Sequence, residues 1–149
     1  MTPVAVRLLE RRDISAILRL QADSLEAAQW SQSAYERLGR AGEAWVAEGE
    51  AQLIGFLVVR AVAREMEILN LAVLPTARRR GIGRALLQHA LSWASSHGTA
   101  RVFLEVRHSN AAARQFYEAH GFVCTGTRRN YYQDPVEDAL LLMRNVDPC

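Results

Sequence analysis

The segment with the clearest capacity for chemistry is a turn over residues 78–84. Two glycines, Gly81 and Gly83, lie two positions apart, directly after an apolar stretch and directly before an amphipathic one. Glycine lets a backbone approach a ligand closely, and the first N–H groups of a helix point at an anion. Arginines add positive charge at the same end: Arg78, Arg79, Arg80 and Arg84. The turn therefore predicts a cradle for a phosphate or a diphosphate.

Two known phosphate-binding loops do not fit this turn, and two other interpretations stay open. A Walker loop would end in Gly-Lys-Ser or Gly-Lys-Thr, and a dinucleotide loop would have a third glycine at the position of Leu86. A basic surface loop with a glycine as helix cap would have the same spacing. Nucleic-acid binding through the arginines is the other alternative, although one such cluster on a chain of net charge +2 is a weak electrostatic footprint.

A carboxylate further along the chain could transfer protons. Glu105 alternates with Leu104 and Val106 in an apolar stretch, so its side chain lies on the opposite face of the predicted strand. Glu105 could act as a general base. It could equally be a solvated carboxylate, or one paired with Arg107.

A tyrosine and an asparagine form a second candidate pair. Tyr117 follows Asn110 by seven residues, so both side chains project from nearly one face of a helix. The Tyr117 hydroxyl could donate a proton to a leaving group, or its ring could pack in a core beside Phe116. Asn110 stands where a helix begins, and its side chain could cap that helix.

Hydrophobic periodicity predicts the elements that would position these residues. Apolar stretches predict strands over residues 4–9, 43–48, 52–60, 65–74, 101–107, 122–129 and 139–144. Helical spacing predicts one helix capped by Asp13, a short one capped by Ser31, and two longer ones over residues 83–97 and 110–120. Hairpins in the first half and a β-α-β-α-β unit in the middle favour an α/β (α+β) fold, with helices on the faces of a sheet.

Composition restricts the class of protein. The chain has 149 residues, 50% hydrophobic and 23% charged, so residues 1–149 are expected to form a single domain with its own core. No apolar run reaches the roughly 18 residues of a membrane span, and no signal-peptide pattern is visible, so a cytoplasmic location is expected. Cys124 and Cys149 are expected to be free thiols, and the four histidines lack metal-ligand spacing, so no metal is expected.

Two motifs resemble those of the GNAT (Gcn5-related) N-acetyltransferase superfamily. The spacing Arg78-x-x-Gly81-x-Gly83 resembles the family's coenzyme A signature, R/Q-x-x-G-x-G/A. Residues 110–122 resemble its N-x-x-A-x-x-x-Y-x-x-x-G-F segment. The resemblance covers nearly the whole chain and is firmest over residues 65–132. It implies an N-acetyltransferase with a mostly antiparallel twisted sheet, helices on both faces, and acetyl-CoA as co-substrate.

The resemblance also implies where acetyl-CoA would bind. In the family, backbone amides of the glycine loop hold the diphosphate, and a bulged strand end turns N–H groups toward the pantetheine and the acetyl oxygen. The helix within the second motif contributes further contacts. The cofactor-binding residues implied here are Leu71, Ala72, Val73, Arg78, Arg79, Arg80, Gly81, Ile82, Gly83, Arg84, Asn110 and Tyr117.

Catalytic roles follow from the same resemblance. Glu105 would take a proton from the acceptor ammonium through water, and Tyr117 would protonate the departing thiolate. Glu67 is the alternative base, because other members of the superfamily place one on that strand. Nothing around Cys124 suggests an activated nucleophile, so we expect direct transfer in a ternary complex without an acetylated enzyme.

A narrower resemblance concerns the acceptor. Residues 104–110, 128–132 and 137–139 resemble the bacterial ribosomal-protein-alanine acetyltransferases of the RimI type, which act on the N-terminal alanine of a small-subunit ribosomal protein. Trp30 stands at that group's Trp-Ser position, but Gln29 replaces the proline often found before it. Tyr131 and Tyr132, in a predicted loop, would grip the acceptor or be ordinary surface aromatics.

Three functions are therefore compatible with the sequence. The leading one is acetylation of a protein N-terminus, with no nucleic acid or membrane as partner. A second is acetylation of a small-molecule amine or a lysine side chain. A third is a coenzyme A-binding sensor, which would need neither Glu105 nor Tyr117.

Overall fold

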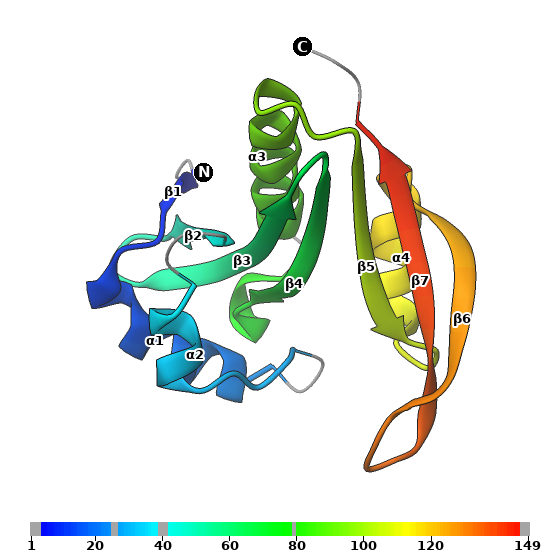
Figure 1. The fold of residues 1–149 in the computed structure, drawn as a ribbon. Helices are drawn as coiled ribbons and strands as arrows, with labels where there is room; N and C mark the ends of the chain where they lie inside the picture. Colours follow the sequence, from blue (N-terminus) through cyan, green and yellow to red (C-terminus); the bar gives the residue numbers. More distant parts are fainter. Residues whose placement is uncertain (1–3, 25–26, 39–41, 79, 147–149) are drawn as a thin grey trace.

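One seven-stranded sheet organises the computed structural model, which describes residues 4–24, 27–38, 42–78 and 80–146. The strand order is β1-β2-β3-β4-β5-β7-β6, and β4 and β5 are the parallel pair among the described neighbours (Figure 1). The other described pairs are antiparallel. The strands are β1 (Ala5–Leu8), β2 (Gly42–Glu48), β3 (Leu53–Val62), β4 (Glu65–Val73), β5 (Arg101–Arg107), β6 (Val123–Tyr132) and β7 (Glu137–Asn145).

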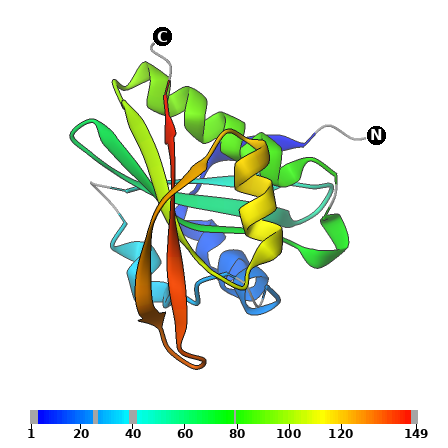
Figure 2. The same cartoon turned by 90° about the vertical axis from the view of Figure 1, so that its right-hand side faces the viewer.

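Helices cover both faces of this sheet. The helices are α1 (Ile14–Ala22), α2 (Gln32–Glu36), α3 (Ile82–Ser96) and α4 (Ala111–Ala119). On one face α3 and α4 pack over a core that includes Trp45 and Leu57, and on the other α1 and α2 pack over Phe56 and Val58. Figure 2 shows α4 beside the β6–β7 hairpin, whose tip projects beyond the rest of the molecule. The expected mixed, mostly antiparallel sheet with helices on both faces is confirmed.

The sheet splits between its two parallel strands. In the described residues, the ladder between β4 and β5 joins residues 65–67 to residues 101–103 and goes no further. Beyond this point the two strands diverge (Figure 1). The later part of β4 still pairs with β3 on its other side. Its edge toward β5 is therefore left available to a ligand.

A β-bulge lies at Leu69, earlier in β4 than the family resemblance implied. Val58 pairs with Asn70 and the next residue, Val59, pairs with Ile68, so Leu69 is the extra residue. The register over residues 71–73, where the bulge was expected, is continuous. An extra residue reverses the side-chain alternation. Ile68 accordingly packs in the core under α3, whereas Ala72 packs in the core under α1.

Two other local expectations were wrong. Tyr131 and Tyr132 end strand β6 and do not lie in a loop, because Tyr132 pairs with Glu137 across the hairpin after an irregular stretch. Asp13 does not cap α1 with its side chain. Its carboxylate instead accepts hydrogen bonds from the Arg7 guanidinium at 2.7 and 2.9 Å, which lowers the pKa of Asp13.

Two predicted caps are confirmed. The Ser31 hydroxyl accepts a hydrogen bond from the Ala34 N–H at the start of α2. The Asn110 side chain accepts one from the Ala113 N–H, at 3.1 Å, at the start of α4. Within the described segments, no helix has the length and apolar character needed to cross a bilayer.

Candidate active site

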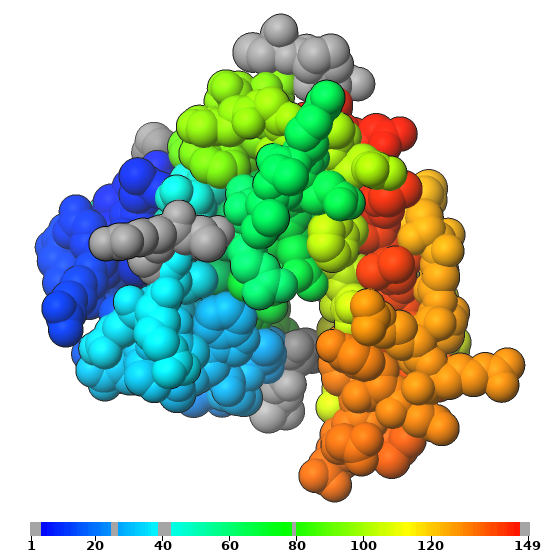
Figure 3. Space-filling view, in the orientation of Figure 1, coloured from blue at the N-terminus to red at the C-terminus, as the bar shows by residue number. Residues whose placement is uncertain are grey.

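A cleft of about 710 Å³ occupies the split between β4 and β5. Both strands line it, together with α4, the start of α3, Tyr132 and the segment 27–29 that precedes α2. Figure 3 shows α2, with the described residues just before it, and the β6–β7 hairpin on opposite sides of an opening. The cleft thus joins the glycine turn to both candidate proton-transfer residues, which are 12 positions apart in the sequence.

The start of α3 forms one end of this cleft. Gly81 adopts the left-handed conformation, with φ of 77°, and has no side chain to cap the helix. The N–H groups of the first turn lack acceptors within the helix. Gly55 lets this helix approach the sheet, because a Cβ there would lie 3.1 Å from Ile82 and 3.2 Å from the Ala72 carbonyl oxygen. Close packing therefore holds the helix start beside the end of β4.

Positively charged side chains surround this helix start. The Arg78 Nε lies 3.4 Å from the Val73 carbonyl oxygen and the residue lines the cleft. Arg80 and Arg84 are exposed, and Arg79 lies outside the described residues. Ile82 is buried, so its side chain packs in the core and leaves its backbone for a ligand. Unpaired amides, the helix dipole and cationic side chains suit an anion such as a diphosphate.

The absence of a side chain at Gly83 keeps the cleft open beside the start of α3. A Cβ at Gly83 would lie 3.4 Å from the Phe116 ring and 3.8 Å from Val73, and all three residues line the cleft. A larger side chain would therefore project among them. The missing side chain at Gly83 leaves space for a ligand that extends from the start of α3 into the cleft.

Tyr117 lines the middle of the cleft from helix α4. It is 5% exposed, and its ring makes edge contacts with Phe116 and Phe122, at centroid distances of 5.1 and 5.3 Å. Burial raises the pKa of its hydroxyl. The hydroxyl is therefore protonated at neutral pH. Asn110, which caps the same helix, lines the cleft as well.

Glu105 lines the same cleft from strand β5. Its side chain is 14% exposed, and its carboxylate lies 3.2 Å from the Arg128 Nε. The negative charge of Glu105, together with a hydrogen bond from the Tyr131 hydroxyl, raises the pKa of that tyrosine. The expected alternation is confirmed, because Leu104 and Val106 are buried on the other side of the strand.

The partner of Glu105 is Arg128, and Arg107 is engaged elsewhere. Arg107 donates to the Glu137 carboxylate at 3.1 Å and stacks 4.4 Å from the centre of the Tyr132 ring. Glu137 also accepts from the Ser109 N–H, and these bonds lower its pKa. Burial, with the nearby Glu105 charge, raises the pKa of Tyr132.

Register explains how Arg128 reaches Glu105 from two strands away. Both Arg107 and Arg128 pair with Ala139, which lies between them on β7. A short side chain at that position leaves space above the sheet for both long arginines. The pairing of Glu105 is therefore a consequence of the β6–β7 hairpin.

Two other predicted residues stand apart from the cleft. Trp30 does not line it and packs on Tyr35, with ring centroids 5.4 Å apart. Glu67, the alternative base, is absent from the lining and accepts a hydrogen bond from Arg60 at 2.8 Å. Tyr131 reaches the site through its bond to Glu105, and it is 48% exposed.

Sequence reasoning missed the segment 27–29, Asn70 and the contribution of Arg128. Asn70 carried a signal, since it is a polar residue within an otherwise apolar stretch of β4. Arg128 carried a weaker one, as a basic residue shortly before two tyrosines. The segment 27–29 carried none, because its contacts are with residues far away in the sequence.

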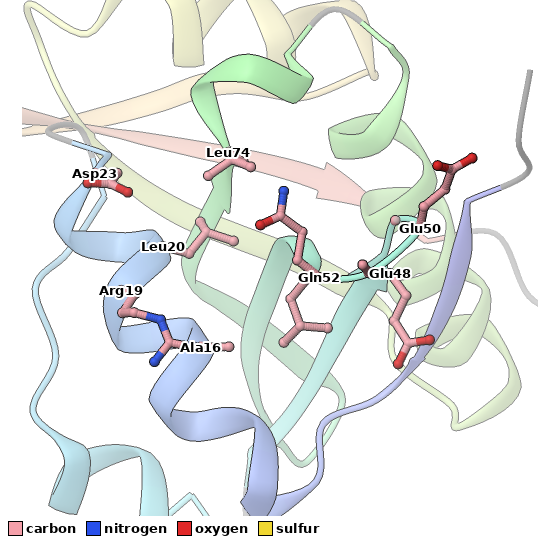
Figure 4. Close-up of a pocket in the computed structure, with 11 residues that line it drawn as sticks. Ala16, Arg19, Leu20, Asp23, Glu48, Glu50, Gln52 and Leu74 are labelled. Atoms are coloured by element: carbon pink, nitrogen blue, oxygen red, sulfur yellow. The ribbon is translucent and has the colours of Figure 1, made fainter.

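A second cavity, of about 560 Å³, lies between α1 and the β2–β3 turn (Figure 4). Asp23, Glu48 and Glu50 line it, with Arg19 as a cationic side chain. Three carboxylates would repel a diphosphate. The split between β4 and β5 is therefore the better candidate for the site.

A split sheet, a helix start suited to an anion, and a carboxylate and a buried phenol that line one cleft fit an enzyme that transfers acyl groups to amines. The comparison with known families agrees. Residues 10–122 match the acetyltransferase (GNAT) family, and the chain belongs to this family and is an N-acetyltransferase. Members of the family use acetyl-CoA as co-substrate.

Individual proteins of the family give a more specific comparison. The chain is 34% identical over 139 residues to the [ribosomal protein bS18]-alanine N-acetyltransferase of Escherichia coli (strain K12), covering 90% of this chain and 92% of that one. The crystal structure of the ribosomal-protein-S18-alanine N-acetyltransferase from Escherichia coli matches with a TM-score of 0.88 and 31% identity, covering 99% and 96% of the two chains. Ard1 from Thermoplasma volcanium matches with a TM-score of 0.89 and 31% identity, covering 98% and 99%. Both predicted resemblances are confirmed.

Proposed function

We propose that this enzyme acetylates the α-amine of a protein, and that its acceptor is the N-terminal alanine of the small-subunit ribosomal protein bS18. One observation carries the proposal: Glu105 and Tyr117 line a single cleft together with the start of α3. The relative that is 34% identical over most of the chain, and is named for this acceptor, supports the choice of substrate. Such an acceptor places the reaction in the cytoplasm and requires no contact with a membrane or a nucleic acid.

The residues around the start of α3 would bind the co-substrate. The amides of residues 81–84, with the charges of Arg78, Arg80 and Arg84, would hold the diphosphate. The edge of β4 over residues 71–73, which has no strand partner on the β5 side, would orient the arm that carries the acetyl group. Asn110 would contribute one further contact. Bound acetyl-CoA supplies an acetyl group activated as a thioester.

Two residues of this chain would handle the protons. Glu105 would take one proton from the acceptor ammonium, which leaves a neutral amine able to attack. The amine nitrogen then bonds to the acetyl carbon as the carbon–sulfur bond breaks. Tyr117 would give its hydroxyl proton to the departing sulfur, and the second proton lost by the amine nitrogen would restore the Tyr117 hydroxyl. No acetyl group is held by the enzyme at any point.

Mass spectrometry of a peptide set tests the acceptor. One peptide begins with alanine and copies the start of the ribosomal protein, a second has the same sequence with a blocked α-amine and an internal lysine, and a polyamine represents small acceptors. We expect acetylation of the free alanine α-amine alone. The Tyr117→Phe variant, run in parallel, should lower the rate about 100-fold and so exclude chemical acetylation. Label on the lysine or on the polyamine would overturn the proposed acceptor.

A further inference from the structure

The segment 27–29 forms the wall of the cleft opposite the β6–β7 hairpin, and one side chain joins it to the sheet. The Asn70 Oδ1 accepts a hydrogen bond from the Ala28 N–H at 3.1 Å, and its Nδ2 donates to the Ala28 carbonyl oxygen at 2.9 Å. Asn70 is 5% exposed and lies on β4. Its amide thus satisfies both backbone groups of one residue, as a neighbouring strand would.

Two further buried side chains extend this contact. The Tyr35 hydroxyl lies 3.4 Å from the Asn70 Nδ2 and donates to the Gln21 Oε1 at 2.5 Å. The Gln21 amide in turn bonds both backbone groups of Trp30, its Nε2 donating to the Trp30 carbonyl oxygen at 2.5 Å. Burial raises the pKa of Tyr35 to about 12, so its hydroxyl remains a donor at neutral pH. Ala28 is therefore tied to β4 and Trp30 to α1, and Tyr35 on α2 links the two side chains that hold them.

The bulge at Leu69 is what directs Asn70 to this segment. Regular alternation would place Asn70 on the same face as Ile68, under α3. The extra residue turns it to the face of α1 and α2, and turns Leu71 and Val73 the other way, into the α3 core. One irregularity therefore serves both sides of the cleft: Leu71 and Val73 line the co-substrate end, and Asn70 holds the acceptor wall.

We propose that Asn70 is a positioning residue for the acceptor: through Ala28 it sets the wall against which the acceptor amine is presented to Glu105. The inference rests on the proposed function, because it assigns the end of the cleft away from the start of α3 to the acceptor. Asn70 itself transfers no proton. Its loss should impair binding of the acceptor and leave binding of acetyl-CoA at the other end intact.

Steady-state kinetics of Asn70→Ala, with acceptor and acetyl-CoA varied in turn, test the proposal. We expect the KM for the alanine-initiated peptide to rise about tenfold, as for the loss of two hydrogen bonds, with the KM for acetyl-CoA changed by less than about twofold. Val58→Ala is the matched control, because Val58 pairs with Asn70 in the same buried layer and has no part in the network. It should lower thermal stability without raising the acceptor KM.

Hydrogen exchange gives a second readout that needs no acceptor. In Asn70→Ala the Ala28 amide should exchange at least about tenfold faster than in the unchanged protein. In Val58→Ala, the exchange rate of the Ala28 amide divided by that of the β3 amides should be the same as in the unchanged protein. Asn70→Ser serves if the alanine variant does not fold. An unchanged acceptor KM in a protein that acetylates the peptide, or a parallel rise in both KM values, would overturn the inference. Failure of the unchanged protein to acetylate the peptide would instead refute the proposed acceptor.

Discussion

The two walls of the proposed acceptor end are held by different kinds of interaction. The wall over residues 27–30 is held by neutral side chains, Gln21, Tyr35 and Asn70, which are at least 95% buried. The wall formed by the β6–β7 hairpin is held by charges near the surface, and the Arg128 side chain is 59% exposed. Buried hydrogen bonds are costly to break, whereas exposed ion pairs contribute about 0–1 kcal/mol. The first wall is therefore built for rigidity, and the second can rearrange when an acceptor enters.

This difference indicates a division of labour. Glu105, the candidate base, belongs to the charged side, where its carboxylate forms an ion pair with Arg128 and a hydrogen bond with Tyr131. An incoming ammonium can replace the exposed arginine at little cost. The opposite wall carries no titrating group at neutral pH, because the pKa of Tyr35 is raised to about 12.

The largest effect is expected from the charged side. Glu105→Gln keeps the shape of the side chain but removes the base, so kcat should fall by about 100-fold or more with little change in acetyl-CoA binding. Stopped-time peptide assays across pH would measure it. Glu67→Gln is the matched control, because Glu67 is bonded to Arg60 and does not line the cleft. A greater loss in Glu67→Gln than in Glu105→Gln would move the base to β4.

A smaller effect, on the free energy of unfolding, is expected from a substitution in the buried wall. Tyr35→Phe removes a hydroxyl that bonds Gln21 and Asn70, so the free energy of unfolding should fall by about 1–2 kcal/mol. Tyr131→Phe on the opposite wall, where the side chain is 48% exposed, should cost about 0.5 kcal/mol or less. Urea denaturation of the two variants compares the walls directly. Equal losses would contradict the distinction between them.

The smallest expected effect is a change with pH in the amide protection near Glu137. The pKa of Glu137 is lowered by its bonds from Ser109 and Arg107, so this contact is fully present above the ordinary value of 4.5 and is lost as pH falls through the lower value of the folded protein. Asn70 does not titrate. The amide protection factor of Ser109 should therefore decline relative to that of Ala28, by about threefold or less, between pH 7 and pH 4. A ratio that is constant with pH would show that the Glu137 contact contributes nothing in solution.

Local patterns predicted most of the elements and several of the site residues. The alternation around Glu105, the caps at Ser31 and Asn110, and the glycine turn before α3 are short-range features, so residue order suffices to recognise them. The family motifs then assigned acetyl-CoA and its place. The roles of Glu105 and Tyr117 in proton transfer stay predictions, as does that of Trp30, which the structure places on Tyr35 and outside the cleft.

The features that only the tertiary structure decided depend on pairing between strands that are far apart in the sequence. The sequence by itself determined which segments are strands and helices and which residues stand at their ends. It could not determine that Arg128, and not Arg107, meets Glu105, because that contact requires β6 and β5 to flank Ala139 on β7. Nor could it place the bulge at Leu69, since a bulge is defined by the register against β3. Alternation along one strand predicts faces only while that register is regular, and here a single extra residue turns Asn70 toward the acceptor wall.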